Sequence, residues 1–382
     1  MTAEALLTSE EFRIVRRGRF VVVELQVPHR VLSTSTRNGG EQEQIRYLIN
    51  HQSCEAADHR ERERYMMGMG LEAYHDVVCS ELHLDPTLVA MMGTAANMNN
   101  VAIVQKKHDE LCVTAVVTAG VEGNATCSGD PAGWVETKDG WKRLNPYEGT
   151  INTMVLINHP LTRGALARAV ITMAEAKSAA LNRLGVRSRQ SQDPATGTGT
   201  DQYCLAAGMG EEKPLTSSST HVMLGELIGT SVRDATLEAL RWQNGLEVSH
   251  TRSLFYALRS YGITEENFWN QAAEVLHGRP FELLKANSRA VFFDPLVSSS
   301  AYAIAAVLDR TRYGTLPENA TRAALNAEAA TLATHVSAST TCWPEFHTEL
   351  VAMGPVSPAC LVLKAVCLGW AAKWAEAKET LA

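Results

Sequence analysis

The chain has 382 residues, of which 45% are hydrophobic and 20% charged, as in ordinary soluble globular proteins. Its formal net charge is −7 and no basic stripe stands out, so we expect no nucleic-acid partner. The run from Arg60 to Arg64 alternates arginine with glutamate, which is typical of a solvated surface rather than a phosphate-binding track. No uncharged apolar stretch reaches about 18 residues, so we expect no membrane span.

Cysteine usage and the N-terminus indicate the compartment. The eight cysteines are scattered without a CxxC pair, which favours free thiols in a reducing environment over disulfides or zinc. Charged residues such as Glu4, Glu10 and Arg13 interrupt any apolar N-terminal segment, so no signal peptide is indicated. We therefore expect a cytoplasmic protein.

The first third of the chain is predicted to be rich in strands. Apolar runs from Phe12 to Val15 and from Phe20 to Leu25 flank a charged turn and predict a hairpin. A helix is expected to begin near Glu41, because the apolar residues between positions 45 and 49 fall on one helical face. Another helix is predicted from Arg60 to Leu82.

The middle of the chain alternates strands and helices. Helices are predicted from Leu161 to Leu184 and from about His221 to Trp242. The segment from Ser128 to Tyr147 holds glycines, prolines and two tryptophans, and we interpret it as an excursion or lid. Strands are predicted at residues 31–33, 88–94, 101–105, 111–119, 150–157 and 203–207.

After Gly245 the pattern becomes helical, with segments near 250–260, 265–276, 296–310, 317–336 and 358–380. We therefore predict an α+β fold. Residues 1–245 would form a mixed β-sheet core layered with helices, and residues 246–382 a mainly helical extension packed on it. The extension could cover an active site, bind a partner or form the interface of a homo-oligomer.

Lys177 is the sharpest anomaly among the candidate site residues. At 100° per residue it falls within the apolar stripe of the helix 161–184. Burying an ammonium without a partner costs several kcal/mol, so we expect a carboxylate or a substrate beside it. Snorkelling to the surface or a structural ion pair are the alternatives. Glu175 lies on the opposite side of this helix. It can belong to the same site as Lys177 only if both faces of the helix contact that site.

Two further segments supply candidate catalytic groups. The loop from Thr196 to Asp201 offers backbone N–H groups, the hydroxyls of Thr198 and Thr200 and one carboxylate, and its glycines let the backbone approach a ligand. An ordinary tight loop is the alternative. His221 stands at a predicted helix start and could act as general acid–base, because its unperturbed pKa lies near neutrality. A capping or surface role is its alternative.

Hydroxyl and amide side chains also stand at predicted strand ends, where binding residues often gather. They are Ser33, Asn38, Thr118 and Asn124. Turn chemistry alone also accounts for asparagine beside glycine. The chain has no GxSxG, no HExxH and no GxGxxG after a strand, so the commonest serine-hydrolase, zincin and dinucleotide-binding interpretations lack support.

Taken together, these segments resemble the adenosylcobinamide amidohydrolase family over roughly residues 13–245. Each is short, but they occur in the family's order. The matching pieces are Val31-Leu32-Ser33 through Asn38-Gly39-Gly40, Met92-Gly93-Thr94-Ala95-Ala96, Thr118-Ala119-Gly120-Val121 with Asn124-Ala125, Gly149-Thr150-Ile151-Asn152, Glu175-Ala176-Lys177, Thr196 to Asp201, and His221 with Leu224-Gly225-Glu226-Leu227-Ile228-Gly229.

The resemblance implies hydrolysis of the amide that joins a propionate side chain of the corrin ring to aminopropanol. The products would be adenosylcobyric acid and 1-amino-2-propanol, a step in corrinoid salvage and cobamide remodelling. No cofactor is assigned, since the corrinoid is the substrate. A different amide or acyl group as substrate, and a non-catalytic corrinoid-binding protein, are the alternatives.

For this chemistry we assign the acid–base role to Asp201 or His221 and the oxyanion role to the loop 196–200. Lys177 and Glu175 would orient the substrate or the attacking group. Substrate hydrogen bonds would come from Ser33, Asn38, Thr118, Asn124, Asn152, Thr198 and Thr200. Water is the preferred nucleophile, with a covalent Ser or Thr route as the alternative. The two acids and the histidine could instead bind a divalent metal. In either case Lys177, Asp201 and His221 are expected to meet in one water-poor pocket.

Overall fold

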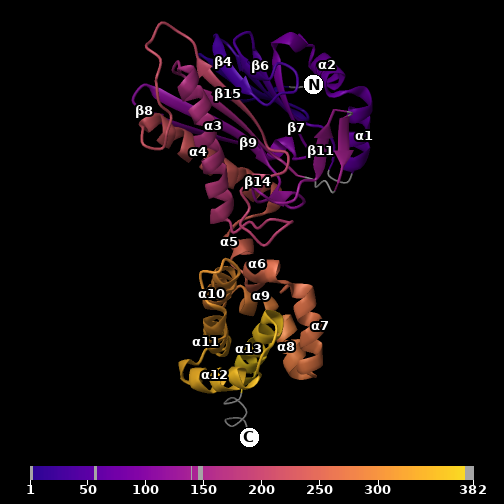
Figure 1. The fold of residues 1–382 in the computed structure, drawn as a ribbon, viewed down its shortest axis with the longest axis vertical. Helices are drawn as coiled ribbons and strands as arrows, with labels where there is room; N and C mark the ends of the chain where they lie inside the picture. The colour runs from indigo at the N-terminus through magenta and orange to yellow at the C-terminus, as the bar shows by residue number, and fades with distance from the viewer. Residues whose placement is uncertain (1–2, 56–57, 139, 145–148, 375–382) are drawn as a thin grey trace. The chain divides into compact units, whose positions relative to one another are not determined.

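The computed structural model describes residues 3–55, 58–138, 140–144 and 149–374. The chain divides into two compact units, Met1–Leu246 and Glu247–Ala382. The first contains β-sheets and helices, and the second is helical in its described part (Figure 1). The α+β fold class predicted from the sequence is thus confirmed.

Two sheets form the centre of the first unit. The strand order of the five-stranded sheet is β1-β2-β3-β6-β7, and that of the six-stranded sheet is β5-β4-β15-β13-β9-β8. Their bounds are β1 (Ala3–Thr8), β2 (Phe12–Arg17), β3 (Phe20–Leu25), β4 (His29–Ser33), β5 (Gly40–Gln42), β6 (Tyr47–Gln52), β7 (Val89–Thr94), β8 (Ala102–His108), β9 (Leu111–Ala119), β13 (Ile151–Ile157) and β15 (Gln202–Gly208). Two pairs of short strands are separate, β10 (Ala125–Thr126) with β14 (Gly197–Thr198) and β11 (Trp134–Thr137) with β12 (Gly140–Arg143).

The first unit has four layers. Apolar side chains of both sheets meet in one core, for example Ile14 and Met92 from the five-stranded sheet with Met154 from the six-stranded one. On the outer face of the five-stranded sheet, Tyr74 and Val78 of α2 pack against its strands. Helices α3 and α4 cover the outer face of the six-stranded sheet (Figure 1). The helices are α1 (His59–Met69), α2 (Leu71–Leu82), α3 (Arg163–Arg183) and α4 (Met223–Asn244).

The helix predicted near Glu41 is wrong. This segment instead forms β5 and β6, which belong to different sheets. Because β6 lies between two layers, it buries Leu48 toward the other sheet and Ile49 toward α2. A strand that is apolar on both faces has no period-2 pattern, so its spacing fitted a helix equally well.

The other predicted elements of the first unit are present. The hairpin at positions 12–25 is β2 and β3, and the helix predicted from Arg60 to Leu82 is α1 and α2, broken at Gly70 with its φ of 89°. The segment interpreted as an excursion contains the hairpin β11–β12. Its residues 139 and 145–147 lie outside the described part of the chain.

The second unit is built from helices around its own apolar core, which includes Phe255, Phe292 and Trp370. Three of its helices, α8, α9 and α12, were not predicted, and residues 375–380 of the last predicted segment lie outside the described range. The helices are α5 (Val248–Thr251), α6 (Leu254–Leu258), α7 (Glu265–Val275), α8 (Arg279–Ala286), α9 (Ser288–Phe292), α10 (Pro295–Arg312), α11 (Glu318–Ser337), α12 (Trp343–Ala352) and α13 (Pro358–Lys373).

The described residues bear on two expectations, that the chain has no membrane span and that its cysteines are free thiols. Across the described ranges, no helix combines the length and the apolar character that a membrane crossing requires. All eight cysteines fall within those ranges, and none is joined in a disulfide.

Candidate functional site

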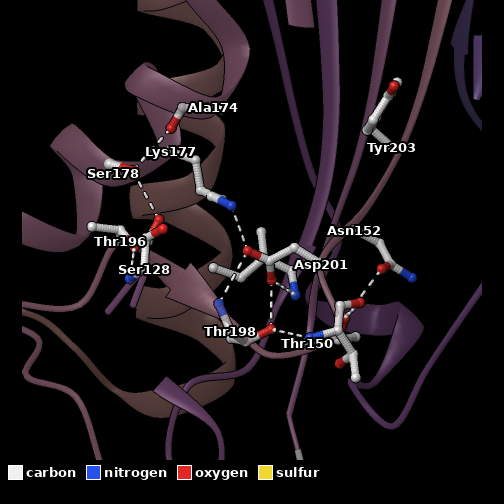
Figure 2. A network of polar contacts seen from close by, with 12 residues as sticks. Ser128, Thr150, Asn152, Ala174, Lys177, Ser178, Thr196, Thr198, Asp201 and Tyr203 are labelled. Carbon is white, nitrogen blue, oxygen red and sulfur yellow. Dashed lines mark hydrogen bonds and ion pairs between the residues drawn. The ribbon is translucent and has the colours of Figure 1, made fainter. Parts of the chain in front are cut away.

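Lys177 has the carboxylate partner that its position in an apolar stripe required. Its ammonium extends from α3 and forms an ion pair with Asp201, which directly precedes β15 (Figure 2). Both side chains are 17% exposed. The pair is therefore shielded from most solvent screening and counts for more than a surface ion pair.

The Asp201 carboxylate is surrounded by donors. One oxygen accepts hydrogen bonds from the Thr198 hydroxyl and, at 3.0 Å, from the Ile151 N–H. The other faces Lys177 and accepts from the Thr198 N–H at 3.0 Å. With four donors on two oxygens, Asp201 ties together α3, the 196–200 loop and the start of β13. This arrangement favours a positioning role over proton transfer.

Gly197 explains why this loop can close so tightly. A Cβ at Gly197 would lie 2.3 Å from Asp201 Oδ2 and 2.8 Å from Lys177 Nζ, so any other residue would push the pair apart. On the far side of the loop, the carbonyl of Gly149 accepts 2.8 Å hydrogen bonds from the Thr200 hydroxyl and from Asn124 Nδ2. The predicted site residues Asn124, Thr198 and Thr200 thus all help to shape this loop.

A chain of buried polar side chains links the two sheets. Asn152 Nδ2 donates to Asn50 Oδ1 at 2.8 Å, and Asn50 Nδ2 donates to the Thr118 hydroxyl at 2.7 Å. Asn152 also donates to the Gly93 carbonyl at 3.0 Å, and Thr150 lies beside it with its hydroxyl donating to the Thr200 carbonyl at 2.6 Å. Thr118 and Asn152 were predicted from the sequence; Asn50 was missed, because its strand was taken for a helix.

The sheet edges that carry these groups border a cavity of about 250 Å³. Helices α1 and α2 close it from the other side, contributing apolar groups such as Met66 and Leu71. Its lining residues are Thr36, His51, Ser53, Cys54, Arg62, Glu63, Met66, Met67, Leu71, Tyr74, Met91, Gly93, Thr94, Ala95, Gly149, Thr150, Thr200 and Gln202. A mostly apolar hollow with a few aimed polar groups is the usual form of a small-molecule site.

A polar relay runs along the wall made by α1, α2 and β6. The His51 ring donates from Nδ1 to the Met92 carbonyl at 3.0 Å, because a carbonyl can only accept. Burial lowers the pKa of His51 to about 4, so the ring is neutral and its Nε2 accepts from the Tyr74 hydroxyl at 2.7 Å. Arg62 Nη2 donates to the same hydroxyl oxygen at 2.7 Å. A cation therefore polarises a phenol at the cavity wall.

Glu63 completes the set of charged groups at the cavity. It follows Arg62 on α1 and makes no hydrogen bond or ion pair with another described residue. A carboxylate that lines a cavity without a partner can accept a proton from bound water. The alternating arginines and glutamates of α1 had indicated a solvated surface, but Arg62 and Glu63 face the cavity. No spacing in the sequence distinguished these two residues from their neighbours.

His221 does not join this region, contrary to expectation. It is exposed just before α4, where neighbouring Ser218 donates to the Ala165 carbonyl near the start of α3. The other end of α4 carries Asn244, which accepts from the Val121 N–H just after the end of β9. At 1.5 Å per residue, a 22-residue helix places His221 roughly 30 Å away from that end. None of the three residues Lys177, Asp201 and His221 is among those that line the cavity described above.

Glu175 also lies apart from the cavity. It is exposed and lines an open groove on the outer surface of α3, together with Lys177, Ser178 and Thr196. The cavity and this groove have no lining residue in common, so the 196–201 loop separates them. Glu175 and Lys177 thus line one hollow, but it is not the cavity.

Two further predicted substrate-binding residues, Asn38 and Ser33, lie away from the cavity. Asn38 has a φ of 59° and donates to the carbonyls of Pro86 at 2.7 Å and Val89 at 2.9 Å, which ties its loop to the other sheet. Ser33 is buried on β4 opposite Cys204 of β15. Neither lines the cavity.

A divalent metal was an alternative built on Asp201, Glu175 and His221, which the structure keeps apart. Over the residues that the structure describes, no group of three or more His, Cys, Asp or Glu side chains is placed to hold a metal ion.

The model of the family described as adenosylcobinamide amidohydrolase matches residues 4–248. The chain therefore belongs to an amidohydrolase family, which makes it a hydrolase by descent. That family is the adenosylcobinamide amidohydrolase family, and the match spans nearly the whole first unit.

Two individual proteins are similar to this chain. The uncharacterized protein MJ1613 of Methanocaldococcus jannaschii is 32% identical over 246 residues, which cover 62% of this chain and 91% of that protein. The crystal structure of the PH0078 protein from Pyrococcus horikoshii OT3 aligns with 62% of this chain and 82% of its own at 13% identity, with a TM-score of 0.30.

Proposed function

We propose that this protein hydrolyses the aminopropanol amide of adenosylcobinamide, giving adenosylcobyric acid and 1-amino-2-propanol in corrinoid salvage. Membership of the family supports the reaction. The observation that carries the choice of site is the cavity in which the carboxylate of Glu63 and the Arg62–Tyr74 pair face the loop around Thr150 and Thr200.

In this proposal water is the nucleophile. Glu63 takes a proton from water as the oxygen adds to the carbonyl carbon, and it returns that proton to the amine nitrogen when the carbon–nitrogen bond breaks. Arg62, anchored through Nη2 on the Tyr74 hydroxyl oxygen, stabilises the negative charge that develops on the carbonyl oxygen. His51, which is neutral, fixes the orientation of the phenol.

The sequence-predicted residues support this geometry in the proposal. Lys177 and Asp201 act as positioning residues, because they hold the loop that presents Thr200 to the cavity. Thr150 and Thr200 offer hydrogen bonds to the amide arm. The covalent Ser or Thr route remains the alternative for the nucleophile, and trapping an acyl-enzyme by mass spectrometry distinguishes the two.

The test is direct. Incubating the protein with adenosylcobinamide should release adenosylcobyric acid and 1-amino-2-propanol, both detected by mass spectrometry. Glu63→Gln should lower kcat by about 100-fold or more, the usual size of a general-base effect. Glu61→Gln, on the exposed side of the same helix, is the matched control and should leave kcat within twofold of wild type. An absence of both products from the wild-type protein would refute the proposal.

A further inference from the structure

A second hollow, of about 470 Å³, lies beside the cavity between α1 and the hairpin β11–β12. Figure 1 shows β11 next to α1. We call this hollow the Trp–Arg groove. It is lined by Arg60, Glu63, Arg64, Met67, Trp134, Trp141 and Arg143.

Regular backbone geometry directs all of these side chains into the groove. On the hairpin, Trp134 pairs with Arg143 and Glu136 with Trp141, and residues directly opposite each other project from the same face. On α1, the lining residues from Arg60 to Met67 follow the i, i+3, i+4, i+7 spacing of one helical face. The groove is therefore formed by one face of α1 and one face of the hairpin β11–β12.

The aromatic groups in the groove are available to a ligand. Trp141 is 53% exposed, and a tryptophan on an isolated two-stranded hairpin contributes little to a core. Trp134 is half-buried, with the Arg143 guanidinium 6.0 Å from its ring centroid. Exposed tryptophans framed by arginines are typical of surfaces that stack on flat conjugated groups.

The groove is continuous with the cavity. Glu63 and Met67 line both, because the cavity takes the face of α1 that also carries Arg62 and Met66. A ligand can therefore extend from one into the other across a single turn of helix. The cavity alone, at about 250 Å³, lies below the usual range of roughly 300–1,000 Å³ for small-molecule sites, so it suits the arm of a larger ligand.

We propose that the Trp–Arg groove holds the flat conjugated macrocycle of the corrinoid while the amide arm enters the cavity. This inference rests on the function proposed above. Trp134 and Trp141 stack against the macrocycle, and the guanidinium groups of Arg60, Arg64 and Arg143 donate to carbonyl oxygens at its rim. Glu63, at the junction, then stands where the arm leaves the ring.

The experiment separates binding of the ring from hydrolysis of the arm. Adenosylcobyric acid keeps the macrocycle and lacks the aminopropanol amide, so equilibrium dialysis followed by its visible absorption measures binding of the ring alone. Trp134→Ala and Trp141→Ala should each weaken its binding about fivefold, which is the usual effect of losing one aromatic contact. For adenosylcobinamide, KM should rise by a similar factor while kcat changes less than twofold.

Trp242→Ala is the matched control. Trp242 is 58% exposed and also lies under an arginine, Arg241, but it stands on α4 outside the groove. The Trp242→Ala variant should bind adenosylcobyric acid and hydrolyse adenosylcobinamide like the wild-type protein. The proposal that the groove binds the macrocycle is refuted if the two hairpin variants bind adenosylcobyric acid as tightly as wild type. It is also refuted if Trp242→Ala weakens binding as much as they do.

The outcomes also distinguish this inference from the proposed function. The wild-type protein could bind adenosylcobyric acid in a Trp141-dependent manner and fail to hydrolyse adenosylcobinamide. This result would support ring binding in the groove and refute the proposed hydrolase activity. Hydrolysis with an unchanged KM in both hairpin variants supports the hydrolase and refutes the groove.

Discussion

Lys177 on α3 and Asp201 before β15 form an ion pair whose carboxylate also binds the backbone N–H groups of Thr198 and Ile151. One side chain thereby holds a helix, a loop and a strand in place. The loop bears Thr200, which lines the cavity. The ion pair does not line the cavity itself, so it affects the cavity through the position of this loop.

Asp201→Asn should therefore reduce both stability and activity. The substitution leaves the partly buried ammonium of Lys177 without a counter-charge, at a cost of about 2 kcal/mol in the free energy of unfolding, and kcat should fall at least tenfold as the loop loosens. Urea unfolding and the hydrolysis assay measure the two effects. Asp109→Asn is the control, since Asp109 is exposed with a φ of 48° that asparagine tolerates. Undiminished activity in Asp201→Asn would remove this residue from the site.

Lys177→Met should relieve part of that loss when it is combined with Asp201→Asn. Removing both charges leaves no buried ion, and methionine fits the apolar stripe of α3. The double variant should thus be more stable than the sum of the single effects by about 1 kcal/mol or more. Strictly additive unfolding free energies would mean that the two side chains are not coupled.

Tyr74→Phe should impair catalysis more than folding. It removes the hydroxyl that donates to His51 Nε2 and that Arg62 polarises, while the ring stays in place. A buried acceptor left without its donor costs about 1–3 kcal/mol, and we expect kcat to fall at least tenfold. Tyr65→Phe is the control, because Arg62 covers that ring too at 5.0 Å but no hydrogen bond joins them. Equal kcat values for the two variants would contradict the relay.

Stability should fall as the pH falls from about 6.5 to about 4, in part through His51. Its folded-state pKa of about 4 lies below the ordinary value of 6.5, so the unfolded chain binds a proton in this window and the folded chain does not. The contribution of His51 is complete above pH 6.5 and is lost toward pH 4, a change of about 3 kcal/mol.

His51→Gln isolates this effect. Burial lowers the pKa of His29 and His75 as well, so the wild-type curve alone cannot assign it. The difference in unfolding free energy between wild type and His51→Gln should shrink as the pH falls from 7 to 4. A difference that stays constant across that range would contradict the neutral, buried ring.

His221→Ala should leave kcat/KM within about twofold of wild type. The side chain is exposed just before α4 and is not among the residues that line the cavity. Steady-state kinetics on adenosylcobinamide checks this. A loss of tenfold or more would restore the acid–base role that the sequence suggested.

Local patterns predicted much of the fold. The charged turn between two apolar runs predicted the hairpin β2–β3, and the apolar stripe of α3 predicted that Lys177 needs a partner. Both follow from neighbours in the chain. The failure at β6 has a physical cause, since a strand between two layers is apolar on both faces and carries no alternation.

That failure hid part of the site. Successive side chains of a strand point to opposite faces, so Asn50 joins the bridge between the sheets and His51 joins the cavity wall. Neither role can be seen once the segment is taken for a helix. His221 failed differently: the helix was right, but the end of the sheet at which it begins depends on the whole topology.

The order of strands along the chain has a consequence for how the first unit is assembled. The polypeptide leaves one sheet after β3, adds β4 and β5 to the other, and returns for β6 and β7. Because of this interlacing, no single proteolytic cut divides the unit into one fragment per sheet. A nascent chain that stops short of β15 lacks Gln202, which lines the cavity, so the ribosome must synthesise nearly all of this unit before the cavity is complete.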